Sequence, residues 1–282
     1  MSKTVGQAVA DLTARFVAID PESARLDARV LVAHMLGLES SLLFSRSGDA
    51  ISPDVDAGIE ALAQRRLNHE PVSRIIGRRE FWGMDFALTA DTLDPRADTE
   101  TLVAAVLDVR SQYAAPRILD LGTGSGCILL AVLKDWPDAT GVGVDLNPGA
   151  VAAAIANAAH FGLGDRAAFR HGNWCEGLEE RFDIIVSNPP YIADKELAGL
   201  ARGVTSFDPD LALRGGTDGL VAYRALIPPA RRYLRDRGRF YLEIGTGQAA
   251  DVVALLMSAG FAPPGEHRDL AGTVRCLEAV TL

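Results

Sequence analysis

The chain has 282 residues, 48% of them hydrophobic and 23% charged, and its formal net charge at pH 7 is −9. This composition is typical of a folded globular protein and excludes a disordered or collagen-like chain. The length favours one large domain with a smaller one, and the acidic balance argues against a general nucleic-acid binder.

Neither a membrane span nor a metal site is indicated. The longest apolar run, Cys127–Leu133, is far shorter than the roughly 18 residues that a span needs. The first residues lack the apolar core of a signal peptide, so we expect no membrane association and a cytoplasmic location. Cys127, Cys175 and Cys276 are far apart and the histidines lack ligand spacing, so we predict no disulfide framework and no metal.

Helical patterns open the chain. Apolar residues recur at helical spacing over Gly6–Ile19. Asp20-Pro21-Glu22 and Ser52-Pro53-Asp54 each place a proline directly after a capping side chain, which indicates a helix start; the second of these helices extends through Leu67. We therefore predict a small helical bundle over residues 1–72, which we assign to partner binding.

A change of pattern follows the helices. Arg74–Ile76 and Phe81–Leu88 contain β-branched and aromatic residues, with Gly77 and Gly83 as breaks. This predicts a β-hairpin linker over residues 73–92.

Five arginines gather at the end of this helical part. They are opposed by one acid, Glu70, and are Arg65, Arg66, Arg74, Arg78 and Arg79. The cluster is typical of a solvated helix end and hairpin. The alternative is a docking patch for an anionic or polar macromolecule.

Strands and helices alternate over residues 93–282. The expected strands are Arg117–Leu121, Thr140–Asp145, Phe182–Ser187 and Arg239–Ile244. The expected helices are Gly126–Lys134, Pro148–Phe161, Leu220–Leu234 and Gln248–Ala259. Such alternation predicts an α/β domain with a mostly parallel sheet covered by helices on both faces.

A glycine-rich turn joins the first of these strands to its helix. Its residues are Gly122, Thr123, Gly124, Ser125 and Gly126. Glycines let a ligand approach the backbone, and the helix N-terminus offers N–H groups. The next strand ends at Asp145, whose carboxylate can accept hydrogen bonds from both hydroxyls of a ribose. Together these features predict a ribose-containing ligand, which could be a nicotinamide dinucleotide, a flavin or S-adenosylmethionine.

The tetrapeptide Asn188-Pro189-Pro190-Tyr191 decides between these ligands. It directly follows a buried strand, at the sheet edge where ligands bind in open α/β folds. Two prolines stiffen the backbone, so the Asn188 side-chain oxygen and the Pro189 carbonyl can both accept from one planar –NH2 group. Tyr191 adds a flat face and a hydroxyl. This pattern favours a site that holds a planar amino group over a merely structural proline turn.

With these residues the chain resembles the bacterial release-factor glutamine methyltransferases, the HemK or PrmC family, over nearly its whole length. The resemblance is weakest in the helical N-terminus. Besides the glycine turn and the tetrapeptide, it rests on Phe81-Trp82-Gly83, Leu93–Glu100, Gly172-Asn173-Trp174, Ala212–Leu220 and Leu242–Gln248. The tetrapeptide occurs in many amino-group methyltransferases, whereas the block ending Asp98-Thr99-Glu100 is much narrower.

The resemblance implies a Rossmann-like class I methyltransferase fold with a mostly parallel seven-stranded sheet, joined by a hairpin to the small helical bundle. It implies that Gly122–Gly126, Asp145, Trp174 and Asn188 bind S-adenosylmethionine, which leaves as S-adenosylhomocysteine. Asn188, Pro189, Pro190 and Tyr191 would hold the target glutamine, with Asn188, Pro189 and Tyr191 as the catalytic residues.

The same resemblance implies a substrate. It is the side-chain amide nitrogen of the glutamine in the Gly-Gly-Gln motif of class I peptide-chain release factors, and we expect a monomer that tunes translation termination. Three positions depart from the family pattern, namely Asp94, Ala97 and Asn173. At Asn173 a charged contact to the adenine side is lost, because an asparagine carries no charge. For Trp174 a place in the core is the alternative.

Other functions remain as alternatives. A methyltransferase acting on DNA or RNA bases would use the same tetrapeptide, but it needs a basic groove and a way to read a base outside the stack. A ribosomal-protein glutamine methyltransferase fits less well, because of the Asp98-Thr99-Glu100 ending. A noncatalytic S-adenosylmethionine-binding module and a nicotinamide dehydrogenase both leave the tetrapeptide unexplained.

Overall fold

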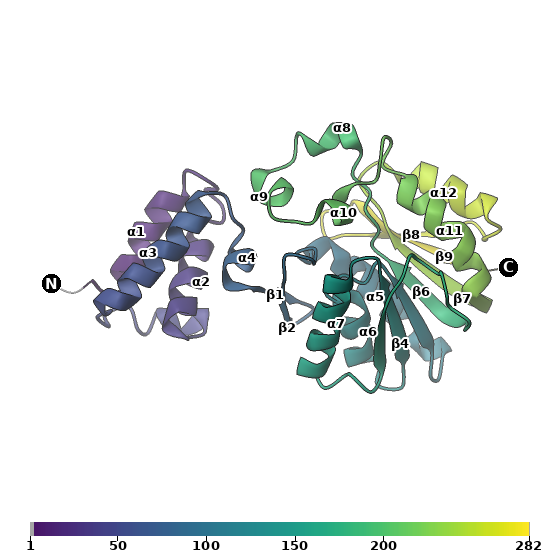
Figure 1. Ribbon diagram of the computed structural model, residues 1–282, viewed down its shortest axis with the longest axis horizontal. Helices are drawn as coiled ribbons and strands as arrows, with labels where there is room; N and C mark the ends of the chain where they lie inside the picture. Colours follow the sequence, from purple (N-terminus) through teal and green to yellow (C-terminus); the bar gives the residue numbers. More distant parts are fainter. Residues whose placement is uncertain (1–2, 282) are drawn as a thin grey trace. The chain divides into compact units, whose positions relative to one another are not determined.

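The computed structural model describes residues 3–281, and the chain divides into two compact units. One unit comprises the residues up to Arg78 together with Ala201–Phe207, and the other comprises the rest of the chain. Figure 1 shows that the first unit is helical and that the second contains the large sheet.

Three helices form the core of the first unit: α1 (Val5–Phe16), α2 (Ala24–Leu36) and α3 (Pro53–Leu67). The predicted start of α3 is confirmed, because the Ser52 hydroxyl accepts from the Val55 amide and Pro53 occupies the first turn. Helix α2 begins later than its Asp20-Pro21-Glu22 signal predicts. The Asp20 carboxylate instead accepts from the Glu22 amide in the preceding turn.

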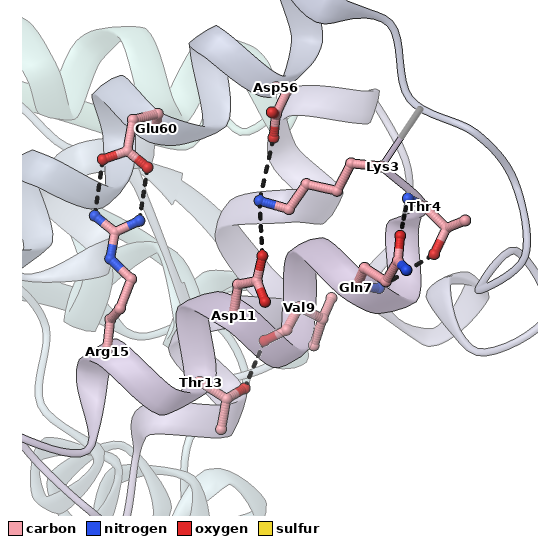
Figure 2. A network of polar contacts seen from close by, with 9 residues as sticks. All are labelled: Lys3, Thr4, Gln7, Val9, Asp11, Thr13, Arg15, Asp56 and Glu60. Carbon is pink, nitrogen blue, oxygen red and sulfur yellow. Dashed lines mark hydrogen bonds and ion pairs between the residues drawn. The ribbon is translucent and has the colours of Figure 1, made fainter. Parts of the chain in front are cut away.

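Polar contacts join α1 to α3, as Figure 2 shows. Arg15 donates to both carboxylate oxygens of Glu60, at 2.6 and 2.8 Å, which lowers the pKa of Glu60 to about 2. Lys3 lies between the carboxylates of Asp11 and Asp56, at 3.0 and 3.3 Å. These pairs hold the two helices in register along their exposed edges.

One predicted element of this unit is wrong. Arg74–Ile76 belongs to a short helix, α4 (Val72–Ile76), and not to a strand. Pro71 precedes its first turn and Gly77 ends it with a φ of 71°. These residues at the two helix ends outweigh the strand preference of the two isoleucines. Ile75 is buried in the helical core.

Two of the five arginines of the predicted cluster are neutralised within the helical unit. Arg65 donates to both carboxylate oxygens of Glu70, at 2.8 and 2.5 Å. Arg66 donates to Asp27 at 2.8 Å, and both of these side chains are largely buried. These contacts favour the structural explanation of Arg65 and Arg66 over a docking patch.

The predicted hairpin is confirmed in β1 (Arg78–Phe81) and β2 (Met84–Ala87), which form a two-stranded sheet. Trp82 and Gly83 make the turn between them, with φ values of 54° and 64°. Two consecutive residues with positive φ are typical of the tight turns that match the twist of a hairpin.

The second unit contains a seven-stranded sheet in the order β5-β4-β3-β6-β7-β9-β8. Strands β3 to β7 pair in parallel, and β9 and β8 are antiparallel, which confirms the mostly parallel sheet. The strands are β3 (Arg117–Leu121), β4 (Thr140–Asp145), β5 (Ala167–His171), β6 (Phe182–Ser187), β7 (Leu234–Glu243), β8 (Gly265–Arg268) and β9 (Val274–Val280).

Helices cover both faces of this sheet. Successive residues of β6 alternate between two cores: Ile184 and Val186 enter one, and Ile185 enters the other. The first core includes α5 (Glu100–Asp108) and α6 (Cys127–Asp135), with α7 (Pro148–His160) beside them. The second includes α11 (Val221–Tyr233) and α12 (Ala249–Ser258). This alternation is the predicted two-sided burial.

Short elements complete the chain. They are η1 (Ser40–Leu43), η2 (Ala97–Thr99), η3 (Arg110–Gln112), α8 (Asp194–Leu197), α9 (Arg202–Thr205) and α10 (Asp210–Leu213). Within residues 3–281, no helix combines the length and the apolar character that crossing a membrane requires.

Candidate functional site

The site lies where three neighbouring strands of the sheet end together. Leu121 of β3 pairs with Val144 of β4 on one side and with Ser187 of β6 on the other. The glycine turn, Asp145 and the tetrapeptide directly follow these three positions. Strand order reverses between β3 and β6, and such a switch point is where open α/β sheets bind ligands.

A cavity opens at this edge of the sheet. Its wall includes Gly122, Gly124, Asp145, Trp174, Asn188 and Pro190 among the predicted site residues. The remaining lining residues are Asp91, Leu93, Val144, Leu146, Asn147, Gly172, Asn173, Pro209, Leu211 and Ala212. The predicted site residues that do not line it are Thr123, Ser125, Gly126, Pro189 and Tyr191.

The glycine turn has a backbone that only glycine adopts easily. Gly122, Gly124 and Gly126 have φ values of 74°, 55° and 81°. A Cβ atom on Gly124 would meet no atom within 4 Å, so this residue leaves open space beside the cavity. The turn therefore offers a ligand a bare backbone surface.

The amides of this turn are used within the protein. Gly122 and Thr123 donate to the Val144 carbonyl at 2.8 and 3.0 Å, and Gly124 donates to Asp145 Oδ2 at 2.8 Å. A pyrophosphate requires amides that point at it. The lining contains two carboxylates and neither lysine nor arginine, so the cavity fits a ligand with hydroxyls and positive charge better than a dinucleotide.

Asp145 shapes the cavity as well as lining it. Its Oδ2 accepts from Gly124 and its Oδ1 accepts from the Asn147 amide at 2.8 Å. Burial raises the pKa of this carboxyl, and the backbone hydrogen bonds oppose the rise. Each carboxylate oxygen can accept a second hydrogen bond, so the side chain remains able to bind two hydroxyl groups.

Trp174 lies against the glycine turn. Its ring carbon Cζ3 would be 3.7 Å from a Cβ atom on Gly122, and its own φ is 50°. The ring packs on the apolar core at one side and lines the cavity at the other. Neighbouring Asn173 also lines the cavity, where its amide donates to Glu176 at 3.0 Å.

Asn188 is oriented by a residue from the block Leu93–Glu100. Its Nδ2 donates to the Thr99 hydroxyl at 3.3 Å, and Thr99 is only 2% exposed. Because the amino end of the amide is held by Thr99, its oxygen is the atom left to face the cavity. This hydrogen bond is compatible with an acceptor role of the Asn188 oxygen, which stays a prediction.

Tyr191 reaches a buried carboxyl at the end of β7. Its hydroxyl donates to Glu243 Oε1 at 3.3 Å. Burial raises the pKa of the Glu243 carboxyl to about 7, and the hydroxyls of Thr99 and Tyr191 oppose the rise. Burial and the nearby Glu243 raise the pKa of Tyr191 well above its usual value, so its hydroxyl keeps its proton.

Sequence reasoning assigned no role to the residues that enclose the tetrapeptide. Gln248 donates to the Tyr191 carbonyl at 2.9 Å and to the Gly219 carbonyl at 3.3 Å. Gly219, with a φ of 77°, approaches so closely that a Cβ atom would lie 2.5 Å from the Tyr191 carbonyl oxygen. Both belong to sequence blocks that the resemblance quoted, which was the available signal.

Asp120, at the end of β3, predicts a pH dependence of stability. Burial raises the pKa of its carboxyl to about 7, from a usual value of 3.8. The folded protein thus keeps this proton up to near pH 7, whereas the unfolded chain loses it near pH 4, so the carboxyl costs stability as the pH rises between these values.

We expect Asp120→Asn, which cannot ionise, to raise Tm relative to wild type by an amount that grows between pH 5 and pH 7. Thermal unfolding of both proteins across this range measures the difference. A difference independent of pH would show that Asp120 titrates normally.

Two family models match the chain. One, described as the PrmC N-terminal domain, matches residues 7–77. The other, the methyltransferase small domain, matches residues 90–203.

Relatives match over most of the chain. It is 49% identical over 258 residues to the release factor glutamine methyltransferase of Rhodospirillum rubrum, a match that covers 92% of this chain and 79% of that protein. The corresponding protein of Bradyrhizobium diazoefficiens is 46% identical, with 95% and 92% covered. A solved methyltransferase structure from Pyrococcus furiosus has a TM-score of 0.52 at 15% identity, covering 77% of this chain and 96% of that one. The structural likeness confirms the Rossmann-like methyltransferase fold.

Proposed function

The chain belongs to the release factor glutamine methyltransferase family, and on this premise we propose that it methylates the side-chain amide nitrogen of a release-factor glutamine. The methyl donor is S-adenosylmethionine, as its methyltransferase family implies. The observation that carries the proposal is the orientation of Asn188, whose amide nitrogen is held by Thr99 beside the cavity.

The substrate we propose is the glutamine of the Gly-Gly-Gln motif in class I peptide-chain release factors. Glycines beside the glutamine allow a loop to enter a narrow site without side-chain clashes. We place the reaction in the cytoplasm and expect the enzyme to act as a monomer.

The residues present fit S-adenosylmethionine. Asp145 would hold the ribose hydroxyls, the bare backbone at Gly122 and Gly124 would lie along the ligand, and Trp174 would contribute an apolar wall. The acidic lining suits its positive charge. When bound, it supplies a methyl group on a positively charged sulfur.

Asn188 and Pro189 prepare the nucleophile. An amide nitrogen is a weak nucleophile, because its lone pair is delocalised into the carbonyl. The Asn188 side-chain oxygen and the Pro189 carbonyl would accept both N–H groups of the glutamine and turn its nitrogen toward the cavity. Acceleration then comes from positioning and from dipoles that are already fixed in place.

No strong base is required of the protein. A methylated amide that still carries its extra proton is a strong acid and releases it readily. The same polar groups that bind the amide therefore suffice, and we assign no catalytic histidine.

Intact-mass analysis tests the proposal. Wild-type enzyme and S-adenosylmethionine are incubated together with one of three acceptors in separate reactions. The acceptors are a class I release factor, the same factor carrying Gln→Ala in its Gly-Gly-Gln motif, and nucleic acid. We expect a gain of one methyl group on the intact factor alone. Methyl transfer to nucleic acid instead would establish the alternative, a base methyltransferase.

We propose that the helical unit docks the release factor. Because Arg65 and Arg66 are neutralised internally, an apolar contact is the better-supported means. Phe44 is 88% exposed in this unit, and nearby in the sequence Leu42 is 49% exposed. Large exposed aromatic side chains commonly anchor protein interfaces.

Phe44→Ser is therefore expected to raise the KM for the release factor roughly tenfold, while the Kd for S-adenosylmethionine stays unchanged. The matched control is Met257→Ser, on the outer side of α12, where the side chain is 51% exposed. An unchanged KM for Phe44→Ser would remove this side chain from the docking surface.

A further inference from the structure

Beneath the tetrapeptide lie two buried polar side chains that come from distant parts of the chain. Thr99 closes the short helix η2 and Glu243 ends strand β7; both are 2% exposed. Apolar side chains at these positions could be buried at a lower cost in free energy, because burying polar groups is unfavourable unless they are hydrogen-bonded. Their presence under the site therefore calls for a function.

The hydrogen bonds among these groups have a defined direction. The Tyr191 hydroxyl donates to Glu243 Oε1 at 3.3 Å, while Glu243 Oε2 is buried without a hydrogen-bond partner among the described residues. The Thr99 hydroxyl oxygen accepts from Asn188 Nδ2 at 3.3 Å. An amide that presents its nitrogen to Thr99 presents its oxygen on the opposite side.

Arg275, on strand β9, forms ion pairs next to Thr99. Arg275 lies 3.1 Å from Asp98, the residue before Thr99, and 2.9 Å from Asp269. Its charge also favours the deprotonated form of Glu243 and so lowers the pKa of that carboxyl. The turn that carries Thr99 is thereby tied to the strand beside Glu243.

We propose that Thr99 and Glu243 are positioning residues for methyl transfer, which set the orientation of the Asn188 amide and the place of the Tyr191 hydroxyl. This inference rests on the proposed function. Neither residue is required to touch the substrate. Each acts through a tetrapeptide side chain, and a flipped Asn188 amide would present a donor where the substrate amino group needs an acceptor.

The test compares Thr99→Val, which removes the hydroxyl at constant shape, with Thr99→Ser, which retains it. For Thr99→Val we expect kcat to fall roughly 10- to 100-fold with the KM for the release factor and the Kd for S-adenosylmethionine unchanged. Thr99→Ser should restore most of the rate. Thr281→Val is the matched control, because Thr281 is also buried and its hydroxyl donates to the Arg235 carbonyl.

A double-variant cycle separates positioning from general damage. If Thr99 acts through Asn188, adding Thr99→Val to Asn188→Ala should cause no further loss of kcat. Glu243→Gln should lower kcat, because an amide can present an N–H to the Tyr191 hydroxyl where the carboxyl accepts from it. It should not lower Tm, because it removes a buried carboxyl. A merely structural role predicts the opposite order, with Tm falling and kcat preserved.

The outcomes distinguish failure of this inference from failure of the proposed function on which it rests. Wild-type enzyme that methylates no release factor contradicts the proposed function. Active wild-type enzyme with a Thr99→Val variant as active as Thr281→Val overturns the role of Thr99 alone. If Thr99→Val does not fold, Thr99→Ala removes the same hydroxyl without the added methyl group, and full activity of that variant overturns the role equally.

Discussion

Replacing Asn188 with alanine is expected to lower kcat for release-factor methylation by roughly 100-fold or more. The side chain lines the cavity and is held by a single hydrogen bond, to Thr99. Its loss removes a preorganised acceptor from the substrate amino group but removes little buried packing. Stopped assays at saturating S-adenosylmethionine, together with thermal unfolding, measure the two effects separately.

Asn157→Ala is the matched control for this substitution. Asn157 is 1% exposed and bonds to both backbone groups of Ala87 and to the Ser125 carbonyl. Its replacement leaves buried backbone groups without partners, so we expect a large fall in Tm. Asn188→Ala with a near-normal rate, or with a Tm as low as that of Asn157→Ala, would refute the catalytic role.

The second large effect is expected at Asp145. Asp145→Ala should weaken S-adenosylmethionine binding by roughly 1.5–3 kcal/mol, because two ribose hydroxyls lose a charged acceptor. This corresponds to a rise in Kd of roughly 10- to 150-fold. The amides of Gly124 and Asn147 lose their acceptor as well, so the turn itself is loosened.

Calorimetric titration of wild type and Asp145→Ala measures this loss. Asp91→Ala provides the control, since Asp91 is an exposed carboxylate of the same cavity that contacts Asn147. A similar loss in both variants would mean that the overall negative charge of the cavity matters and that Asp145 has no specific role.

Local patterns predicted the elements that form the floor of the site. The bounds of β3, β4 and β6 agree with the prediction, because each is an apolar run between polar or glycine residues and is buried on both faces. Strands β8 and β9 were not predicted, and neither was β5. It lies at the sheet edge, where Ala167–His171 needs no continuous apolar run.

Competing local signals account for the incorrect element. At Val72–Ile76 the isoleucines favour a strand, while Pro71 and Gly77 favour a short helix. Burial of Ile75 in the helical core decides between them, and that burial is a tertiary contact.

The sequence by itself determined where ligand-binding residues stand along the chain: the glycine turn, Asp145 and the tetrapeptide each follow a strand. Only the tertiary structure placed Thr99, Glu243, Gly219 and Gln248 around that tetrapeptide. The physical reason is that strand and helix patterns depend on residues that are close together in the sequence. The orientation of the half-buried Asn188 amide and of the Tyr191 hydroxyl depends on Thr99 and Glu243, which lie 89 and 52 residues away along the chain.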